Sequence, residues 1–102
     1  MNIQYKKGVL ELLVLNYLNK KDYYGYDISD TLSKNMSISA GTVYPILRKL
    51  KDEGYLTTYL SEASNGPVRK YYTITNKGKK RLTILKKEWV DFINITHSLL
   101  ED

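Results

Sequence analysis

The sequence predicts one small, mainly α-helical domain with a single β-hairpin, followed by a long C-terminal helix. Apolar residues follow a helical period in three segments between residues 7 and 53 and again over residues 76–100. Aromatic and β-branched residues cluster instead in two short runs between them, which is typical of strands. The 102 residues, 42% hydrophobic and 26% charged, suit one soluble globular domain.

Two helices are predicted in the first third of the chain. Residues 7–18 are apolar around most of the helical circumference, which predicts a helix buried on several sides. The polar residues 19–22 that follow are expected to end this helix. A second, shorter helix is predicted from Tyr24 to about Asn35, where Ile28 and Leu32 lie four residues apart on one face.

A third helix is predicted from about Ser39 to Glu53. Ser37 and Ser39 are both suitable N-caps, because a serine oxygen can accept the unpaired amide hydrogens of a first turn. Gly54 is expected to follow the helix as its C′ residue. One face carries an apolar stripe that would pack on a core, namely Val43, Ile46, Leu47 and Leu50.

Pro45 lies within this third helix and has two interpretations. A proline inside a helix removes a backbone hydrogen bond and can clash with the carbonyl four residues earlier, here that of Gly41, at a cost of about 3 kcal/mol. Pro45 either kinks the helix and sets its angle, or the regular helix begins only near Tyr44 and Pro45 occupies its first turn. The sequence leaves both open.

A hairpin is predicted after Gly54. Residues 55–60 and 69–74 are rich in aromatic and β-branched residues, so both runs are predicted as strands. Residues 61–68 join them, and the Ala-Ser-Asn-Gly-Pro composition of residues 63–67 predicts a projecting turn.

Residues 76–100 are predicted as one long helix with Thr75 as its cap. Six side chains recur along it at alternating intervals of three and four, the spacing of a coiled-coil seam. We therefore expect a two-fold dimer in which this helix packs on its partner and on the first helix. The alternative is a helix that folds back on its own domain alone. The seam consists of Leu82, Leu85, Trp89, Phe92, Thr96 and Leu99.

Positive charge is concentrated in the middle of the chain. Residues 41–81 hold nine basic and three acidic residues, a balance of +6, whereas the rest of the chain sums to −1 within a net charge of +5. A basic stretch in a neutral body is the pattern of a surface that binds a polyanion. A solvated, lysine-rich surface would have the same composition.

Three helices followed by a hairpin form the element order of a winged helix-turn-helix, whose third helix enters the major groove of duplex DNA. Arg69 and Lys70, just after the hairpin tip, are expected to neutralise phosphates or to reach the minor groove. The residues expected to face DNA from the third helix are Ser39, Thr42, Tyr44, Arg48 and Lys49.

Several short motifs occur in a fixed order along the chain. They are YGYDI at residues 24–28, GTVYPILRKL at 41–50, EG at 53–54, GPVRKYY at 66–72 and TNKG at 75–78. Together they cover most of the chain and resemble the PadR family of transcriptional regulators. The single C-terminal helix is similar to the smaller, LmrR-like members of that family.

The resemblance implies a cytoplasmic, homodimeric, sequence-specific regulator, a repressor that binds a palindromic operator in double-stranded DNA. Residues 1–75 would form the winged helix-turn-helix domain, and residues 76–102 the dimerisation helix, packed with the first helix as one compact unit. Val68 departs from the family pattern of proline or another basic residue, so fewer phosphate contacts are expected from the wing. The DNA contacts that the resemblance implies are Thr42, Tyr44, Lys49, Gly66, Arg69 and Lys70.

Trp89 is the only tryptophan, and two roles are open to it. In LmrR-like members a tryptophan on this helix lines a flat cavity at the dimer interface. That resemblance implies a hydrophobic or aromatic small-molecule effector, bound by Trp89 and Phe92, that releases the protein from DNA. Aromatic faces suit such a ligand because they stack on planar and cationic compounds. The alternative is that both side chains fill the dimer core.

The composition argues against several other functions. The chain has no cysteine, so a thiolate zinc site, a disulfide and a cysteine nucleophile are ruled out. His97 is the only histidine and has no acid pair or nucleophile beside it, so we expect neither an enzyme, nor a metal site, nor a cofactor. No run reaches the roughly 20 apolar residues that cross a membrane. Glu11 and Asn16 interrupt the leucine-rich segment near the N-terminus, so no secretory leader is expected.

Two alternative functions share this element order. Some winged helices are protein-interaction modules, but such a module needs no excess of positive charge along its third helix and hairpin. A plasmid replication or partition factor would also bind duplex DNA, and its footprint on repeated sites would distinguish it from a simple repressor.

Overall fold

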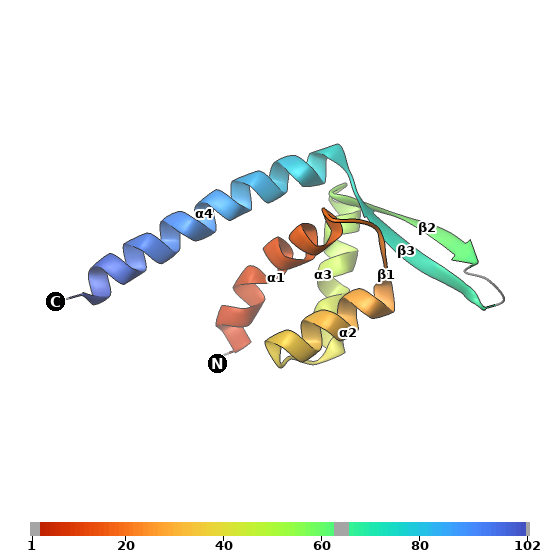
Figure 1. Cartoon of the computed structure of the whole chain (residues 1–102), viewed down its shortest axis with the longest axis horizontal. Coiled ribbons are helices and arrows are strands. Elements are labelled where there is room, and N and C mark those ends of the chain that lie inside the picture. The colour runs from red at the N-terminus through yellow and green to blue at the C-terminus, as the bar shows by residue number, and fades with distance from the viewer. Residues whose placement is uncertain (1–2, 63–65, 102) are drawn as a thin grey trace.

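A computed structural model of the chain describes residues 3–62 and 66–101. The prediction of a mainly helical fold with a small antiparallel sheet is confirmed. Helices α1, α2 and α3 form a central body, from which the β2–β3 hairpin and most of α4 extend in opposite directions (Figure 1). The elements are α1 (Ile3–Leu18), β1 (Tyr23–Tyr24), α2 (Gly25–Met36), α3 (Ala40–Asp52), β2 (Leu56–Glu62), β3 (Val68–Ile74) and α4 (Asn76–Leu100).

The sheet contains a strand that the sequence analysis missed. β1 pairs antiparallel with β3, with Tyr23 opposite Tyr72 and Tyr24 opposite Tyr71, so the strand order is β1-β3-β2. Two residues are too short a run to show a strand period, and β1 leads directly into α2. The predicted hairpin is confirmed for β2 and β3, while residues 63–65 of its predicted turn lie outside the described residues.

The core lies between the three helices and one face of the sheet. Each helix and the strands β2 and β3 contribute at least one buried apolar side chain, and each fully buried leucine or isoleucine stabilises the fold by about 1.5–3 kcal/mol. The predicted stripe of α3 packs into this core, although Ile46 is only partly buried. The buried apolar residues are Leu10, Val14, Leu15 and Leu18 of α1, Ile28 and Leu32 of α2, Val43, Leu47 and Leu50 of α3, Leu56 of β2, Tyr72 of β3 and Leu82 of α4.

The helix ends follow the predicted chemistry except at Ser37 and Ser39. Thr75 caps α4, since its side-chain oxygen accepts a 3.0 Å hydrogen bond from the amide of Gly78. Gly54 follows α3 with a φ of 84°, as a C′ glycine does. Ser39 is the N-cap of α3, but its hydroxyl lies 3.1 Å from the Thr42 hydroxyl and bonds no amide. Ser37 is not an N-cap, because it ends α2 in the left-handed conformation.

Pro45 lies inside α3. The helix begins at Ala40, so Pro45 is its sixth residue, and a regular helix that starts only near Tyr44 is ruled out. Pro45 and Gly41 are both exposed, so water can hydrate the Gly41 carbonyl that the proline leaves unpaired.

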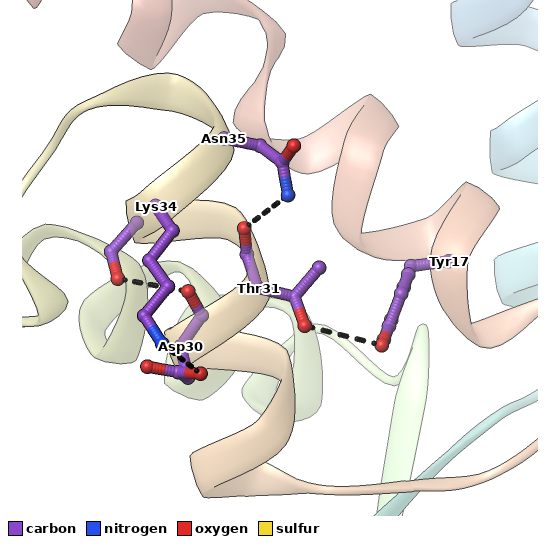
Figure 2. A network of polar contacts seen from close by, with 6 residues as sticks. Tyr17, Asp30, Thr31, Lys34 and Asn35 are labelled. Carbon is purple, nitrogen blue, oxygen red and sulfur yellow. Dashed lines mark hydrogen bonds and ion pairs between the residues drawn. The ribbon is translucent and has the colours of Figure 1, made fainter.

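Polar contacts run along α2, and one of them joins this helix to α1 (Figure 2). The Tyr17 hydroxyl of α1 lies 3.4 Å from the Thr31 hydroxyl of α2, and Asn35 donates a 2.7 Å hydrogen bond to the Thr31 carbonyl. Lys34 pairs with Asp30 at 3.0 Å on the outer side of the same helix. The Tyr17–Thr31 contact joins α2 to α1, whereas the other two contacts lie within α2, and α2 in turn packs on α3.

The described helices have no membrane-spanning candidate among them, because none combines the necessary length and apolarity.

Gly78 gives a sharp test of how α4 joins the body. A Cβ at this position would collide with the Tyr55 carbonyl and lie 2.7 Å from a carbon of Ile74. We expect Gly78→Ala to lower the free energy of unfolding by about 1–3 kcal/mol, because overpacking forces backbone shifts. Urea unfolding followed by circular dichroism measures this change.

Gly41→Ala is the matched control. Its Cβ would meet only the Ser39 hydroxyl at 3.7 Å, which is an ordinary contact. The free energy of unfolding should therefore be unchanged or slightly higher. Equal stability of the two variants would contradict the close approach of α4 to residue 55.

Candidate nucleic-acid interface

α3 turns one face to the core and the other to solvent. Val43, Leu47 and Leu50 are fully buried, while Tyr44 and Arg48 are exposed on the opposite side, four residues apart. Residues four apart lie one above the other on a helix, so these two side chains form one continuous outer surface. The major groove of B-DNA is wide enough to admit a helix with such an exposed ridge.

The alternation of β3 separates the two basic residues of the hairpin. Successive strand residues point to opposite faces, so Arg69 and Lys70 do not share one. Lys70 is on the face of buried Tyr72, with its Nζ 6.0 Å from the centre of that ring. Arg69 is on the other face, with its Cζ 5.0 Å from the ring centre of Tyr24. Gly66, also predicted at the wing, lies two residues before β3.

Tyr72 links Lys70 to the outer surface of α3. Burial raises the pKa of the Tyr72 hydroxyl, the Tyr44 hydroxyl raises it further, and the Arg48 guanidinium opposes both. The charges of Tyr44 and Arg48 thus act on Tyr72 from the exposed surface of α3, and Lys70 lies over the Tyr72 ring. All three residues, Tyr44, Arg48 and Lys70, are predicted to contact DNA.

Arg69 belongs to an aromatic cluster on the outer face of the sheet. Tyr71 stacks on Tyr59 with ring centres 5.6 Å apart, and the Tyr24 ring centre lies 6.1 Å from that of Tyr71. The Tyr59 hydroxyl donates a 2.7 Å hydrogen bond to the Asp22 carboxylate, in the segment that precedes β1. The cluster ties the hairpin to the helical body and sets its direction. The structure thus places Arg69 away from Tyr44 and Arg48.

Lys49 points from α3 toward α1. Its Nζ donates a 2.9 Å hydrogen bond to the Glu11 carboxylate and lies 4.0 Å from a carboxylate oxygen of Glu53. The hydrogen bond to Glu11 is the main cause that raises the pKa of Lys49, and the charge of Glu11 adds to it. An ammonium that already has a carboxylate partner is less available to a phosphate. The structure therefore does not group Lys49 with Tyr44 and Arg48.

The N-terminal turn of α3 lies beside α1. Ser39 and Thr42, both predicted to face DNA, contact each other at this turn. A hollow of about 280 Å³ adjoins it, lined by Gly41, Thr42, Pro45 and Ile46 and, from α1, by Lys7. The sequence analysis did not assign Lys7 to the interface, because a helical period does not show which helices lie side by side.

The predicted seam of α4 is buried at its start and exposed farther along the helix. Leu82 is buried and Leu85 half-buried against the domain's own core. Farther along, Trp89, Phe92 and Leu99 are 40%, 60% and 80% exposed. The described part of the chain leaves this half of the seam uncovered, so the helix does not fold back on its own domain over its whole length.

An apolar groove of about 660 Å³ lies between α1 and α4. Trp89 and Phe92 lie in it with ring centres 6.2 Å apart. The sequence predicted that α4 packs on α1 and that these two residues bind a ligand, but not which α1 residues form the other wall of the groove. The groove is lined by Tyr5, Gly8, Val9, Glu11 and Leu12 of α1 and by Leu85, Glu88, Trp89, Phe92 and Ile93 of α4.

Among residues 3–62 and 66–101, no group of three or more acidic or histidine side chains is placed to hold a metal ion.

Comparison with protein families gives a match over most of the chain. Residues 14–84 match the model of the "Transcriptional regulator PadR-like family". The negative transcriptional regulator PadR of Bacillus subtilis is 35% identical over 78 residues, which cover 72% of this chain and 43% of that protein. A protein of Lysinibacillus sphaericus without an assigned role is 33% identical over 99 residues, covering 93% of this chain and 91% of that protein.

Solved structures show the same architecture. A PadR-like transcriptional regulator from Bacillus cereus superposes with a TM-score of 0.86 at 36% identity, covering 97% of this chain and 98% of that chain. A structure from Streptococcus mutans superposes with a TM-score of 0.83 at 43% identity, covering 90% and 86% of the two chains. Both cover at least nine-tenths of this chain.

The Tyr59–Asp22 tether predicts a change in tyrosine titration. The hydrogen bond to Asp22, followed by burial, raises the pKa of Tyr59 above its ordinary value of 10.0. The donor must be protonated, so the tether is complete below pH 10 and is lost as the pH rises through the raised value. Ionised tyrosine absorbs at 295 nm. We therefore expect Tyr59→Phe to remove part of the absorbance increase that the wild-type protein shows at the highest pH values.

Asp22→Asn provides the complementary variant. It keeps the side-chain shape but removes the charge that holds the proton, so Tyr59 should titrate earlier than in the wild-type protein. An unchanged alkaline end in both variants would show that this hydrogen bond does not form in solution.

Proposed function

This chain belongs to the PadR-like family of transcriptional regulators, and we propose that it acts as a homodimer that binds a palindromic operator in duplex DNA. The observation that carries the proposal is the joint surface of Tyr44, Arg48 and Lys70. The third helix presents Tyr44 and Arg48 as an exposed ridge, and the hairpin presents the exposed Lys70 on the face of the sheet that carries Tyr72. Regulators of this family are not enzymes, in agreement with the sequence analysis.

The contacts to DNA follow from the placement of each side chain. The outer surface of α3 enters the major groove, where Arg48 is suited to a guanine edge or a phosphate and Tyr44 to the adjoining backbone. Lys70 extends this surface onto the hairpin, where the wing approaches the flanking phosphates. Ser39 and Thr42 would contribute from the N-terminal turn of α3, and Gly66 from the segment just before β3. Lys49 and Arg69 already have intramolecular partners, so their contributions to DNA binding are smaller.

A second copy is the occupant that we propose for the exposed half of the α4 seam. Trp89, Phe92 and Leu99 are exposed in one chain, and burying three such side chains favours association. A two-fold dimer presents two α3 helices to the same side of a duplex, which is the geometry that a palindromic site requires. Residues 1–75 then serve DNA binding, and residues 76–102 serve dimerisation.

We infer repression from the printed role of a relative, since the Bacillus subtilis protein is a negative regulator. A dimer bound across a promoter would block transcription. In the proposed dimer the groove between α1 and α4 stays open at the interface and is the effector site, so Trp89 and Phe92 stack on an aromatic or hydrophobic small molecule and do not fill the dimer core completely. An effector would weaken DNA binding only by its difference in affinity between the two states of the dimer. This part of the proposal follows the likeness to LmrR-like members.

Fluorescence anisotropy on duplex DNA from the region upstream of the protein's own gene, against a scrambled duplex, tests the function. At about 150 mM salt we expect nanomolar binding to the upstream duplex and binding at least 1,000-fold weaker to the scrambled one. Weak and equal binding to both duplexes would contradict a regulator of its own promoter. It would favour a protein partner or a distant operator.

Arg48→Ala and Arg69→Ala remove the same side chain from two different surfaces. We expect Arg48→Ala to weaken binding to the upstream duplex about tenfold or more, because Arg48 lies on the outer face of α3. Arg69→Ala should cost less, because its guanidinium lies against Tyr24 on the far face of the sheet. Anisotropy titrations of both variants measure the difference, and a larger loss in Arg69→Ala would reverse the assigned faces.

Leu99→Glu tests the dimer. A carboxylate in a closed seam would lose the burial of Leu99 and gain a desolvation cost, so the dimer dissociation constant should rise tenfold or more. Sedimentation velocity measures it. Ser98→Glu places the same charge one residue earlier, off the seam, and should sediment like the wild-type protein. A wild-type chain that sediments as a monomer at micromolar concentration would refute the dimer.

A further inference from the structure

The groove between α1 and α4 carries a charge opposite to that of the chain. The protein has a net charge of +5, yet among the described residues two glutamates, Glu11 and Glu88, line the groove and no lysine or arginine does. Glu11 is the less exposed of the two and stands among apolar side chains, where electrostatic attraction is stronger than in open water, whereas Glu88 is exposed. The groove therefore favours a compound that combines an apolar body with a positive charge, and the Trp89 ring offers a face for that charge.

The two glutamates differ in what else they contact. Glu11 is three-quarters buried and accepts the 2.9 Å hydrogen bond from Lys49, so one carboxylate touches both the groove and α3. Arg81 of α4 lies close enough to Lys49 for its charge to oppose that of Lys49. Glu88 lies on the opposite wall, and among the described residues no hydrogen bond or ion pair joins it to α3.

We propose that Glu11 makes the groove selective for cations and couples the occupant to α3, because a cation in the groove competes with Lys49 for the same carboxylate. The inference rests on the proposed effector site and adds its ligand class and its route to the DNA-binding helix. Glu11 acts here as a positioning residue. It does not touch DNA, but the ion pair holds the flank of α3 against α1.

The size of the effect is bounded by the nature of the contact. The Lys49 side chain is 52% exposed, and an exposed ion pair changes an equilibrium by about fivefold at most. A cation that takes Glu11 from Lys49 should therefore lower the preference for operator DNA by about two- to fivefold. By linkage, operator DNA should weaken binding of the cation by the same factor.

Tetraphenylphosphonium serves as the probe, because it is a lipophilic aromatic cation, and triphenylphosphine oxide serves as its neutral counterpart. Binding to the full chain is followed by the fluorescence of Trp89, the only tryptophan. Binding to DNA is followed by anisotropy, as the ratio of affinities for the upstream and scrambled duplexes with and without a saturating probe. The ratio cancels the effect of a changed net charge on non-specific binding.

Glu11→Gln and Glu88→Gln remove the same charge from the two walls of the groove. Both variants should bind the cation more weakly and the neutral probe as well as the wild-type protein does. Glu11→Gln should also begin with a specificity ratio two- to fivefold lower and show no further change with the cation. In Glu88→Gln the specificity ratio should still fall as far as in the wild-type protein once the groove is saturated with the cation.

Three outcomes would overturn the proposal. They are a specificity ratio in Glu11→Gln that still falls with the cation, a wild-type protein that binds both probes equally, and a wild-type groove that binds neither. In each case sequence-specific DNA binding by the same preparation would leave the proposed regulator intact. Loss of that binding in the wild-type protein would instead refute the proposed function itself.

Discussion

The packing of α3 is the constraint on which the rest of the structure depends. One side of this helix supplies Val43, Leu47 and Leu50 to the core, so its orientation is fixed by the same burial that stabilises the domain. α1, α2 and β2 all pack against it. The opposite side is then left to solvent in a single defined direction. An interface built on such a helix needs no stabilisation of its own, because the core already holds Tyr44 and Arg48 in place.

The hairpin is held by a second, independent set of contacts. Tyr72 packs toward the core on one face of the sheet, while Tyr59, Tyr71 and Tyr24 form an aromatic row on the other. The short strand β1 is what makes this row possible, because it supplies Tyr24 to the edge of β3. The direction of the wing is thus set by side chains on both faces of a narrow sheet, a structure that a two-stranded hairpin alone would not hold firmly.

The spacing of apolar residues, together with the cap and glycine residues at the helix ends, was enough to predict the main elements. The apolar stripe of α3, the cap at Thr75 and the glycine after α3 all follow from local rules, and α4 has the predicted bounds of Asn76 and Leu100. The partners of charged side chains were not predictable in this way. Lys49 pairs with Glu11, 38 residues away, and only the packing of α1 on α3 brings them together. The division of Arg69 from Lys70 was available from strand alternation, but the sequence analysis treated them as one basic pair.

The length of α4 has a mechanical consequence for a dimer built on it. A helix of 25 residues is about 37 Å long, and it is joined rigidly to the body where Gly78 meets residue 55. A tilt of about 5° at one end of such a rod moves the other end by about 3 Å, which is close to the rise of one base pair. In the proposed dimer α4 is therefore a lever arm. A slight change in the angle between the two α4 helices would alter the distance between the two α3 helices. The crossing angle therefore determines which spacing of half-sites the dimer fits.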